Sequence, residues 1–197
     1  MTQPRPVQPE QFELTQLDVE NLLFALHRCV PIFETLHHLS FQPKGPVEAA
    51  WDNWCENTMR REFIPAMQSV YEHAIGTHVR EILEIDHKLA NGNIGDPVKL
   101  CKEGHRLLFS HLPPQSERTL QKYFHQVQNG ESPAHFLVVY TLRAAAFHIP
   151  FTQAIKAYLF LEAMLNVRHL GSTSPEALLE RFYRTSAQTA SKDLRAA

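Results

Sequence analysis

The sequence has few of the features that mark secreted proteins or nucleotide-hydrolysing enzymes. Only 3 cysteines and 7 glycines occur among its 197 residues. The cysteines (Cys29, Cys55 and Cys101) lie far apart and form no C-x-x-C pair, which excludes a disulfide scaffold and indicates buried, reduced thiols in a cytoplasmic protein. The glycines form neither a phosphate-binding loop of the Walker type nor a G-x-G-x-x-G turn, so nucleotide chemistry is disfavoured.

An excess of charge of one sign is also missing. Lys and Arg number 19 against 21 Asp and Glu, which offers no basic surface to a nucleic-acid backbone. The longest apolar runs, 136–147 and 154–167, are shorter than the roughly 20 residues that a bilayer requires. Both runs are interrupted by charged residues, among them Arg143 and Glu162. We therefore expect neither nucleic acid nor a membrane as a partner.

The two ends of the chain differ from its middle in composition. Residues 1–14 are rich in Pro and Gln and have no apolar core, so they predict a disordered tail and not a signal or transit peptide. The polar segment 187–197 predicts a second disordered tail. The residues between them, 15–186, have the apolar content of one globular domain.

Prolines punctuate this domain where helices would begin. Four X–Pro pairs place Pro at a plausible first helical position, and in three of them the preceding side chain is able to cap the helix. The pairs are Gly45-Pro46, Asp96-Pro97, Ser132-Pro133 and Ser174-Pro175.

Apolar residues between these marks follow the 3.6-residue period of a helix, and no strand pattern competes. In one stretch Asp86 shares the apolar register of Ile82 and Leu89. We predict an all-α, single-domain bundle of about ten helices, with Pro31 and Pro65 cutting or kinking two of them. The predicted ranges are 16–30, 32–39, 47–62, 65–75, 78–91, 97–111, 115–128, 133–147, 151–169 and 175–186. The helices at 133–147 and 151–169 are apolar on nearly all sides, which predicts a packed central pair.

Histidine is abundant, at 12 residues, so metal binding has to be considered. No H-x-x-x-H or H-E-x-x-H spacing occurs that would place two imidazoles one turn apart on a helix. The pairs His37-His38 and His73 with His78 are expected to point in different directions. We therefore predict no metal ligand.

One E-x-x-H pair, Glu84 and His87, supplies half of the motif that a di-iron helix bundle uses. The second copy is missing from the sequence. Glu84, Asp86 and His87 are therefore interpreted as a solvated or capping cluster on a surface helix.

Other catalytic or cofactor arrangements have little support. Ser110 and His111 are adjacent and do not face one another, and no G-x-S-x-G motif is present. A tetrapyrrole pocket would need a histidine among aromatic residues, for which His125 and His148 are the candidates. We predict a protein that is not an enzyme, with no catalytic residue and no cofactor, and keep a metal- or tetrapyrrole-binding helical enzyme as an alternative.

The segment that follows the long apolar helix predicts a contact surface. Arg168 and His169 lie in the last turn and Gly171 lies just beyond it, as charge–dipole interaction and left-handed capping favour. Arginine is well suited to recognition at interfaces. Together with Glu176 and Arg181 on the next helix, these residues are the predicted partner-binding set.

Several blocks, in order, resemble the family of urease accessory protein UreF. They are REFIPAMQSVYEHA with EILEIDHKLA, then EGHRLLFSHLP, then HFLVVYTLRAAAFHIPFTQAIKAYLFLEAMLNVRHLG, and they span about residues 61–182. The chain departs from the family at its start, where LLFALHRCVPIFETLHHLSF replaces the family's Leu-Pro-x-Gly segment, and it is about two residues shorter after Arg168.

The resemblance implies an all-helical, homodimeric, cytoplasmic scaffold without catalytic activity. Such a protein bridges a second accessory protein and a nickel-carrying GTPase, and so assists nickel delivery to urease. A helical interaction module unrelated to urease, such as a repurposed paralogue, is a further alternative.

Overall fold

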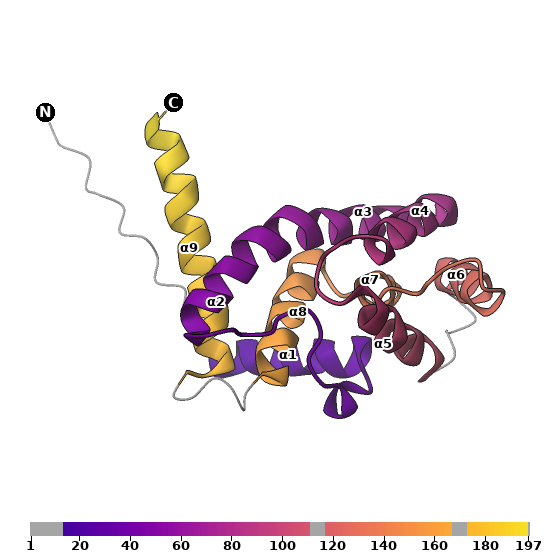
Figure 1. The fold of residues 1–197 in the computed structure, drawn as a ribbon, viewed down its shortest axis with the longest axis horizontal. Coiled ribbons are helices and arrows are strands. Elements are labelled where there is room, and N and C mark those ends of the chain that lie inside the picture. The colour runs from indigo at the N-terminus through magenta and orange to yellow at the C-terminus, as the bar shows by residue number, and fades with distance from the viewer. Residues whose placement is uncertain (1–13, 111–116, 167–172, 197) are drawn as a thin grey trace, which may run out of the picture.

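The computed structural model describes residues 14–110, 117–166 and 173–196, with side chains up to residue 185. Every regular element in these ranges is helical, and no residue in them lies in a β-strand. The fold is therefore all-α, as the periodicity predicts. Figure 1 shows an elongated body, with α9 at one end and α6 at the other.

The helices follow one another through short connections. Their bounds are α1 (Gln16–Cys29), α2 (Val47–Trp54), α3 (Ile64–Ile75), α4 (Val79–Ala90), α5 (Pro97–Ser110), α6 (Arg118–Gln128), α7 (Phe136–Ala146), α8 (Phe151–Leu165) and α9 (Pro175–Ala196). A π-helical segment, η2 (Cys55–Phe63), joins α2 to α3 without a break. When α2, η2 and α3 are counted as one continuous helix, the described residues contain eight helices, so the prediction of about ten was wrong.

Pro65 does not divide the helix that it was expected to cut. Within η2 the backbone hydrogen bonds reach one residue further back, as where the amide of Ile64 donates to the carbonyl of Met59. A π turn is wider than an α turn and therefore accommodates the proline ring with its missing donor. The two helices predicted at 47–62 and 65–75 are consequently one.

The helix predicted at 32–39 is also absent. The backbone of Val30, just before Pro31, is turned out of the helical region, as proline imposes on its predecessor. Only one 3₁₀ turn, η1 (Phe33–Thr35), follows. The amides of Ser40 and Phe41 then donate to the carboxyl group of Glu162, so they are not available to a helix.

Two of the four X–Pro pairs begin a capped helix as predicted. Asp96 accepts from the amide of Lys99, and Ser174 accepts from the amide of Ala177. Pro46 instead serves as the N-cap of α2. The mark at Ser132-Pro133 was wrong, because α7 begins at Phe136.

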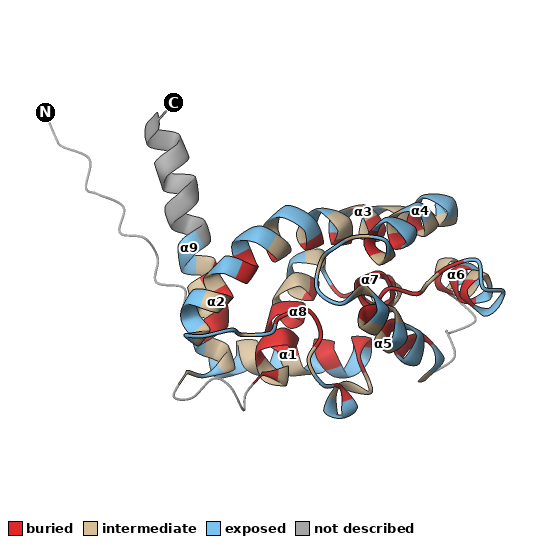
Figure 2. Ribbon diagram, viewed as in Figure 1, coloured by how far each residue is buried: buried red, intermediate tan, exposed pale blue. Residues whose placement is uncertain are grey.

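The two apolar helices α7 and α8 form the centre, shown by their red residues in Figure 2. The phenol of Tyr140 on α7 donates to the carbonyl of Ala154 on α8 over 2.7 Å. Each helix nevertheless has its main neighbours elsewhere. α7 packs on α3 and α5, and α8 packs on α1 and α9.

Asp86 on α4 is fully buried, not solvated. Its carboxyl group accepts from the phenol of Tyr123 at 2.8 Å and from the hydroxyl of Ser132. It also accepts from two successive amides, Ala134 at 3.0 Å and His135 at 2.7 Å. Burial raises the pKa of Asp86, against the lowering effect of these four donors. The interpretation of a surface cluster is therefore wrong for Asp86.

The segment that Asp86 holds is strained and tightly packed. Ala134 has a left-handed backbone with φ of 57°, which costs a non-glycine residue roughly 1–2 kcal/mol. This turn directs successive amides at one carboxylate, as in other anion-binding nests. Gly104 on α5 lies so close that an added Cβ would stand 2.0 Å from the carbonyl oxygen of Ala134.

Glu162 on α8 repeats the arrangement with a different segment. Its buried carboxyl group accepts from the hydroxyl of Ser40, from the amides of Ser40 and Phe41, and from the phenol of Tyr158 at 2.9 Å. One turn further on, the side-chain amide of Asn166 donates to the carbonyl of Phe41 at 3.0 Å. Tyr158, Glu162 and Asn166 thus form one polar stripe that fixes residues 40–41 to the central helix.

Gly104→Ala is expected to destabilise the protein by about 3 kcal/mol or more, because the new methyl group meets backbone atoms that do not move freely. Chemical denaturation measures the change. Gly92→Ala is the matched control, since its added Cβ would find no backbone or side-chain atom closer than 3.3 Å. Equal effects of the two substitutions would contradict the close approach of α5 to residues 134–136.

Glu162→Gln is expected to remove a pH-dependent part of the stability. Burial raises the pKa of Glu162 above its ordinary value of 4.5, so folding favours the protonated form. The contribution is complete below that value and is lost as pH rises through the folded-state pKa. The free energy of unfolding of wild type minus that of the variant should therefore fall as pH increases from about 4.5. A difference that stays constant or grows would contradict this assignment.

Candidate partner-binding site

Arg181 ties the last helix to α2. Its Nε and Nη2 atoms donate to the two carboxylate oxygens of Asp52 at 2.7 and 2.6 Å, and its Nη1 donates to Glu48 at 2.9 Å. The hydrogen bonds that Arg181 donates to Asp52 are the main reason that the pKa of Arg181 is raised. The paired ends of this clamp stay partly in water, with the side chains of Arg181 and Asp52 41% and 38% exposed.

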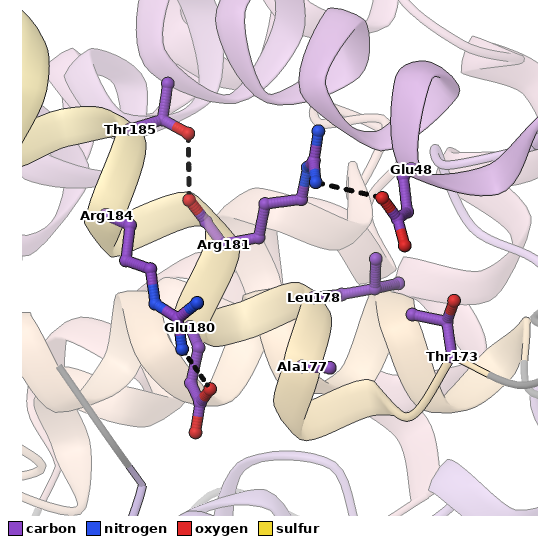
Figure 3. Close-up of a pocket in the computed structure, with 8 residues that line it drawn as sticks. All are labelled: Glu48, Thr173, Ala177, Leu178, Glu180, Arg181, Arg184 and Thr185. Atoms are coloured by element: carbon purple, nitrogen blue, oxygen red, sulfur yellow. Dashed lines mark hydrogen bonds and ion pairs between the residues drawn. The ribbon is translucent and has the colours of Figure 1, made fainter. Parts of the chain in front are cut away.

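A hollow of about 460 Å³ lies beside this clamp, as Figure 3 shows. Its charged side chains are paired: Glu48 accepts a hydrogen bond from Arg181, and Glu180 accepts one from Arg184 at 2.9 Å. Glu180 also accepts from the amide of Leu14. The remaining lining residues are Thr173, Ala177, Leu178 and Thr185.

A second hollow of about 530 Å³ lies between η2, α3, α8 and α9, and its lining is mostly apolar. We call it the α8–α9 groove. Two cations lie over its aromatic rings, Arg60 at 4.6 Å from the ring centre of Phe182 and Lys156 at 5.5 Å from that of Tyr183. The other lining residues are Ile64, Thr152 and Ile155.

The predicted partner-binding residues meet this region only in part. Arg168, His169 and Gly171 lie outside the described residues. Glu176 is half-buried in the first turn of α9, where a carboxylate is favoured by the helix dipole. Arg181 is joined to α2, so its role in partner contact remains a prediction.

The other residues weighed for chemistry are exposed or are bonded to other groups. Glu84 is exposed and paired with Arg80, and His87 hydrogen-bonds the carbonyl of Glu131. His125 and His148, the candidates for a tetrapyrrole ligand, are both exposed. Throughout the described ranges, no group of three or more His, Cys, Asp or Glu side chains is close enough to hold a metal ion.

The cysteines agree with the predicted thiols in most respects. Cys29 and Cys55 are buried and unpaired, whereas Cys101 is half-buried. Burial raises the pKa of Cys29 to about 12 and that of Cys101 to about 11, so their thiols resist ionisation.

In the part of the chain that the structure describes, no helix has the length and apolar character to cross a membrane.

One pair of histidines does not behave as predicted. His73 and His78 were expected to point in different directions, as they would on one continuous helix. The helix ends between them, and the chain turns back. Their Nδ1 atoms lie 3.4 Å apart.

Sequence reasoning missed the residues that carry most of the buried polar contacts. The signals were present, since a lone Glu162 in an apolar helix and Asp86 in an apolar register are both unusual for charged residues. Their hydrogen-bond partners, at 40–41 and 132–135, carry no comparable mark. Asp52 and Glu48, the partners of Arg181, likewise have no feature in the sequence that distinguishes them from ordinary surface residues.

Comparison with models of protein families, with curated proteins and with solved structures found no match to this chain.

Arg181→Met is expected to lower the free energy of unfolding by about 1 kcal/mol, the upper range for a partly exposed ion pair with two aligned hydrogen bonds. Urea denaturation at low salt measures it. Arg184→Met removes only a pair within one helix turn and should cost less than about 0.5 kcal/mol. The difference should shrink at high salt, and equal losses would argue against the clamp.

Proposed function

We propose that this protein is a non-catalytic adaptor of the UreF type that assists nickel delivery to urease. In this role it binds a second accessory protein and a nickel-carrying GTPase, acts in the cytoplasm and forms a homodimer. Its contribution is to position partners, since interfaces of this kind rest on buried apolar area and shape and not on tuned catalytic groups.

The proposal is supported by the way the resembling blocks come together. EILEIDHKLA contributes Asp86, EGHRLLFSHLP contributes Gly104, and the last block begins at His135. Asp86 accepts from the amide of His135, and Gly104 packs against the backbone of residues 134–136. Three blocks that are separate in the sequence therefore form one structural unit.

The observation that carries the adaptor role is the use of the buried polar groups. The carboxyl groups of Asp86 and Glu162 are surrounded by donors from neighbouring segments, and the guanidinium of Arg143 donates to the carbonyls of Cys29 and Arg28 at the end of α1. These groups hold segments of the chain together. Chemistry available to a partner lies at the surface, in the α8–α9 groove.

The α8–α9 groove offers what a docking surface needs. Its lining combines two aromatic rings, two isoleucine side chains and two cations that lie over the rings. Aromatic and arginine side chains are enriched where binding energy concentrates. We assign it to the partner accessory protein. No specific observation favours the alternatives of a metal- or tetrapyrrole-binding enzyme, or of a module unrelated to urease.

A reconstitution with purified proteins tests the proposal. The chain is mixed with the nickel-carrying GTPase and the second accessory protein from the same source, and complexes are resolved by size-exclusion chromatography. Ile155→Asp should weaken binding of the accessory protein by about tenfold or more, because it places an unpaired carboxylate in an apolar interface. Nickel content of co-expressed urease should fall in parallel.

Val98→Asp is the matched control. Val98 is 81% exposed and lies on α5, a helix that is not beside α9 in Figure 1. The substitution should therefore leave the complex and the nickel content unchanged. Circular dichroism verifies that both variants are folded. If wild type forms no complex with either protein and does not alter nickel loading, the adaptor role is wrong.

A further inference from the structure

We propose that two copies of this chain dimerise through the outer face of α1, with the two helices crossing at Phe24. The inference rests on the homodimer of the proposed function and names the face that forms it. The occupant of this face is therefore a second copy of the same chain. Its contacts are a pair of phenylalanine rings and two ion pairs related by a two-fold axis.

The helix α1 has one face in the core and the other in solvent. Leu22 and Leu26 on its inner face are buried, and the helix packs on α7 and α8. On the opposite face Phe24 is 57% exposed and Leu17 is 66% exposed. Seven residues make almost two full turns, so these two side chains lie on the same side of the helix. In Figure 1 α1 lies along the lower edge of the body.

Opposite charges flank Phe24 at equal distances. Glu20 lies four residues before Phe24 and Arg28 lies four residues after it, and all three side chains are exposed. Residues at this spacing form one ridge along the helix surface. A two-fold interface uses the same patch on both copies, so the patch has to be complementary to itself. A ridge with an acid at one end, a base at the other and an aromatic ring between them meets this condition.

The commonest packing of two helices brings these charges together. At a crossing angle of about −50°, the four-residue ridges of both helices run alongside each other. A two-fold axis at Phe24 reverses the order of the second ridge. Glu20 of each copy then lies beside Arg28 of the other. Parallel helices would instead place Glu20 beside Glu20 and Arg28 beside Arg28, so the charge pattern favours the antiparallel pair.

Both charges are available for such a contact. In the described ranges neither Glu20 nor Arg28 forms an ion pair. Glu20 accepts one hydrogen bond, from the side-chain amide of Gln16 at 3.0 Å. The guanidinium of Arg28 lies 5.1 Å from the ring centre of Phe24 and 5.9 Å from that of Phe147. These rings hold the cation beside the proposed crossing point.

Exposure of a single apolar side chain is ordinary and would not identify an interface. Ile75, Val98 and Phe109 are also exposed among the described residues. None of these three has an acidic residue four positions to one side and a basic residue four positions to the other. The symmetric charge pattern therefore distinguishes Phe24 on α1.

Sedimentation velocity of the full-length chain over a range of concentrations tests the face. One crossing of two helices is a small contact, so the dimer should dissociate on dilution. Phe24→Asp should weaken the dimer by about tenfold or more, because it places two carboxylates at the crossing point. Val98→Asp, which changes an exposed residue on α5, is the matched control and should leave the affinity unchanged.

Reversal of the charges tests the antiparallel arrangement. Glu20→Arg and Arg28→Glu each bring like charges together at both symmetry-related positions, so each should weaken the dimer by about tenfold. The two substitutions combined should recover most of the lost affinity. Within one copy these side chains are two turns apart and do not meet, so recovery has to come from contact between copies. Glu81→Arg on α4 is the matched control for charge and should have no effect.

A disulfide between copies gives a second measurement. Helix axes 8–10 Å apart place the two Cα atoms at the crossing point roughly 4–5 Å apart, which a disulfide can bridge. In a chain that carries Cys101→Ser, Phe24→Cys should therefore form a dimer under mild oxidation. Leu17→Cys should not, because the two copies of residue 17 would lie roughly 20 Å apart.

The outcomes separate the face from the homodimer itself. A wild type that is monomeric at about 100 μM would overturn both. A dimer that survives Phe24→Asp, or that the combined charge reversal does not restore, would overturn the α1 face and leave the homodimer standing. Circular dichroism verifies that each variant is folded, and binding of the accessory protein and the GTPase is measured separately in the reconstitution.

Discussion

A carboxyl group inside an apolar bundle has to be surrounded by hydrogen-bond donors, and this requirement organises the protein. Asp86 and Glu162 meet it with the same set of donors: a serine hydroxyl, a tyrosine phenol and two backbone amides. In each case the amides belong to a segment that is not helical. The carboxyl groups thus replace the hydrogen bonds that a helix would have provided.

The placement of the irregular segments then fixes the packing of the helices around them. Residues 132–135 are held against α4 by Asp86, and α5 reaches them because Gly104 has no side chain. Residues 40–41 are held against α8, and Arg143 holds the end of α1 against α7. The polar side chains inside the bundle therefore hold segments of the chain together.

Local rules are broken where tertiary contacts compensate. Ala134 and Thr77 have left-handed backbones that glycine would adopt more easily. The strain at Ala134 directs two amides at Asp86, and the strain at Thr77 brings His73 and His78 together. Pro65 is likewise tolerated inside a helix because η2 widens the preceding turns. A rule that considers only a residue and its sequence neighbours cannot predict any of these compensating contacts.

The sequence by itself determined the helical class, two capped helix starts at Asp96 and Ser174, and the apolar character of the two central helices. These features depend on neighbours within one or two turns, and periodicity and capping describe such neighbours well. Only the tertiary structure decided that Asp86 is buried, that Arg181 joins α9 to α2, and that two histidines face each other across a corner. Each of these contacts depends on where the chain turns and on which distant segment packs against it. The backbone conformation of a single residue, such as Thr77 or Ala134, can decide which side chains meet.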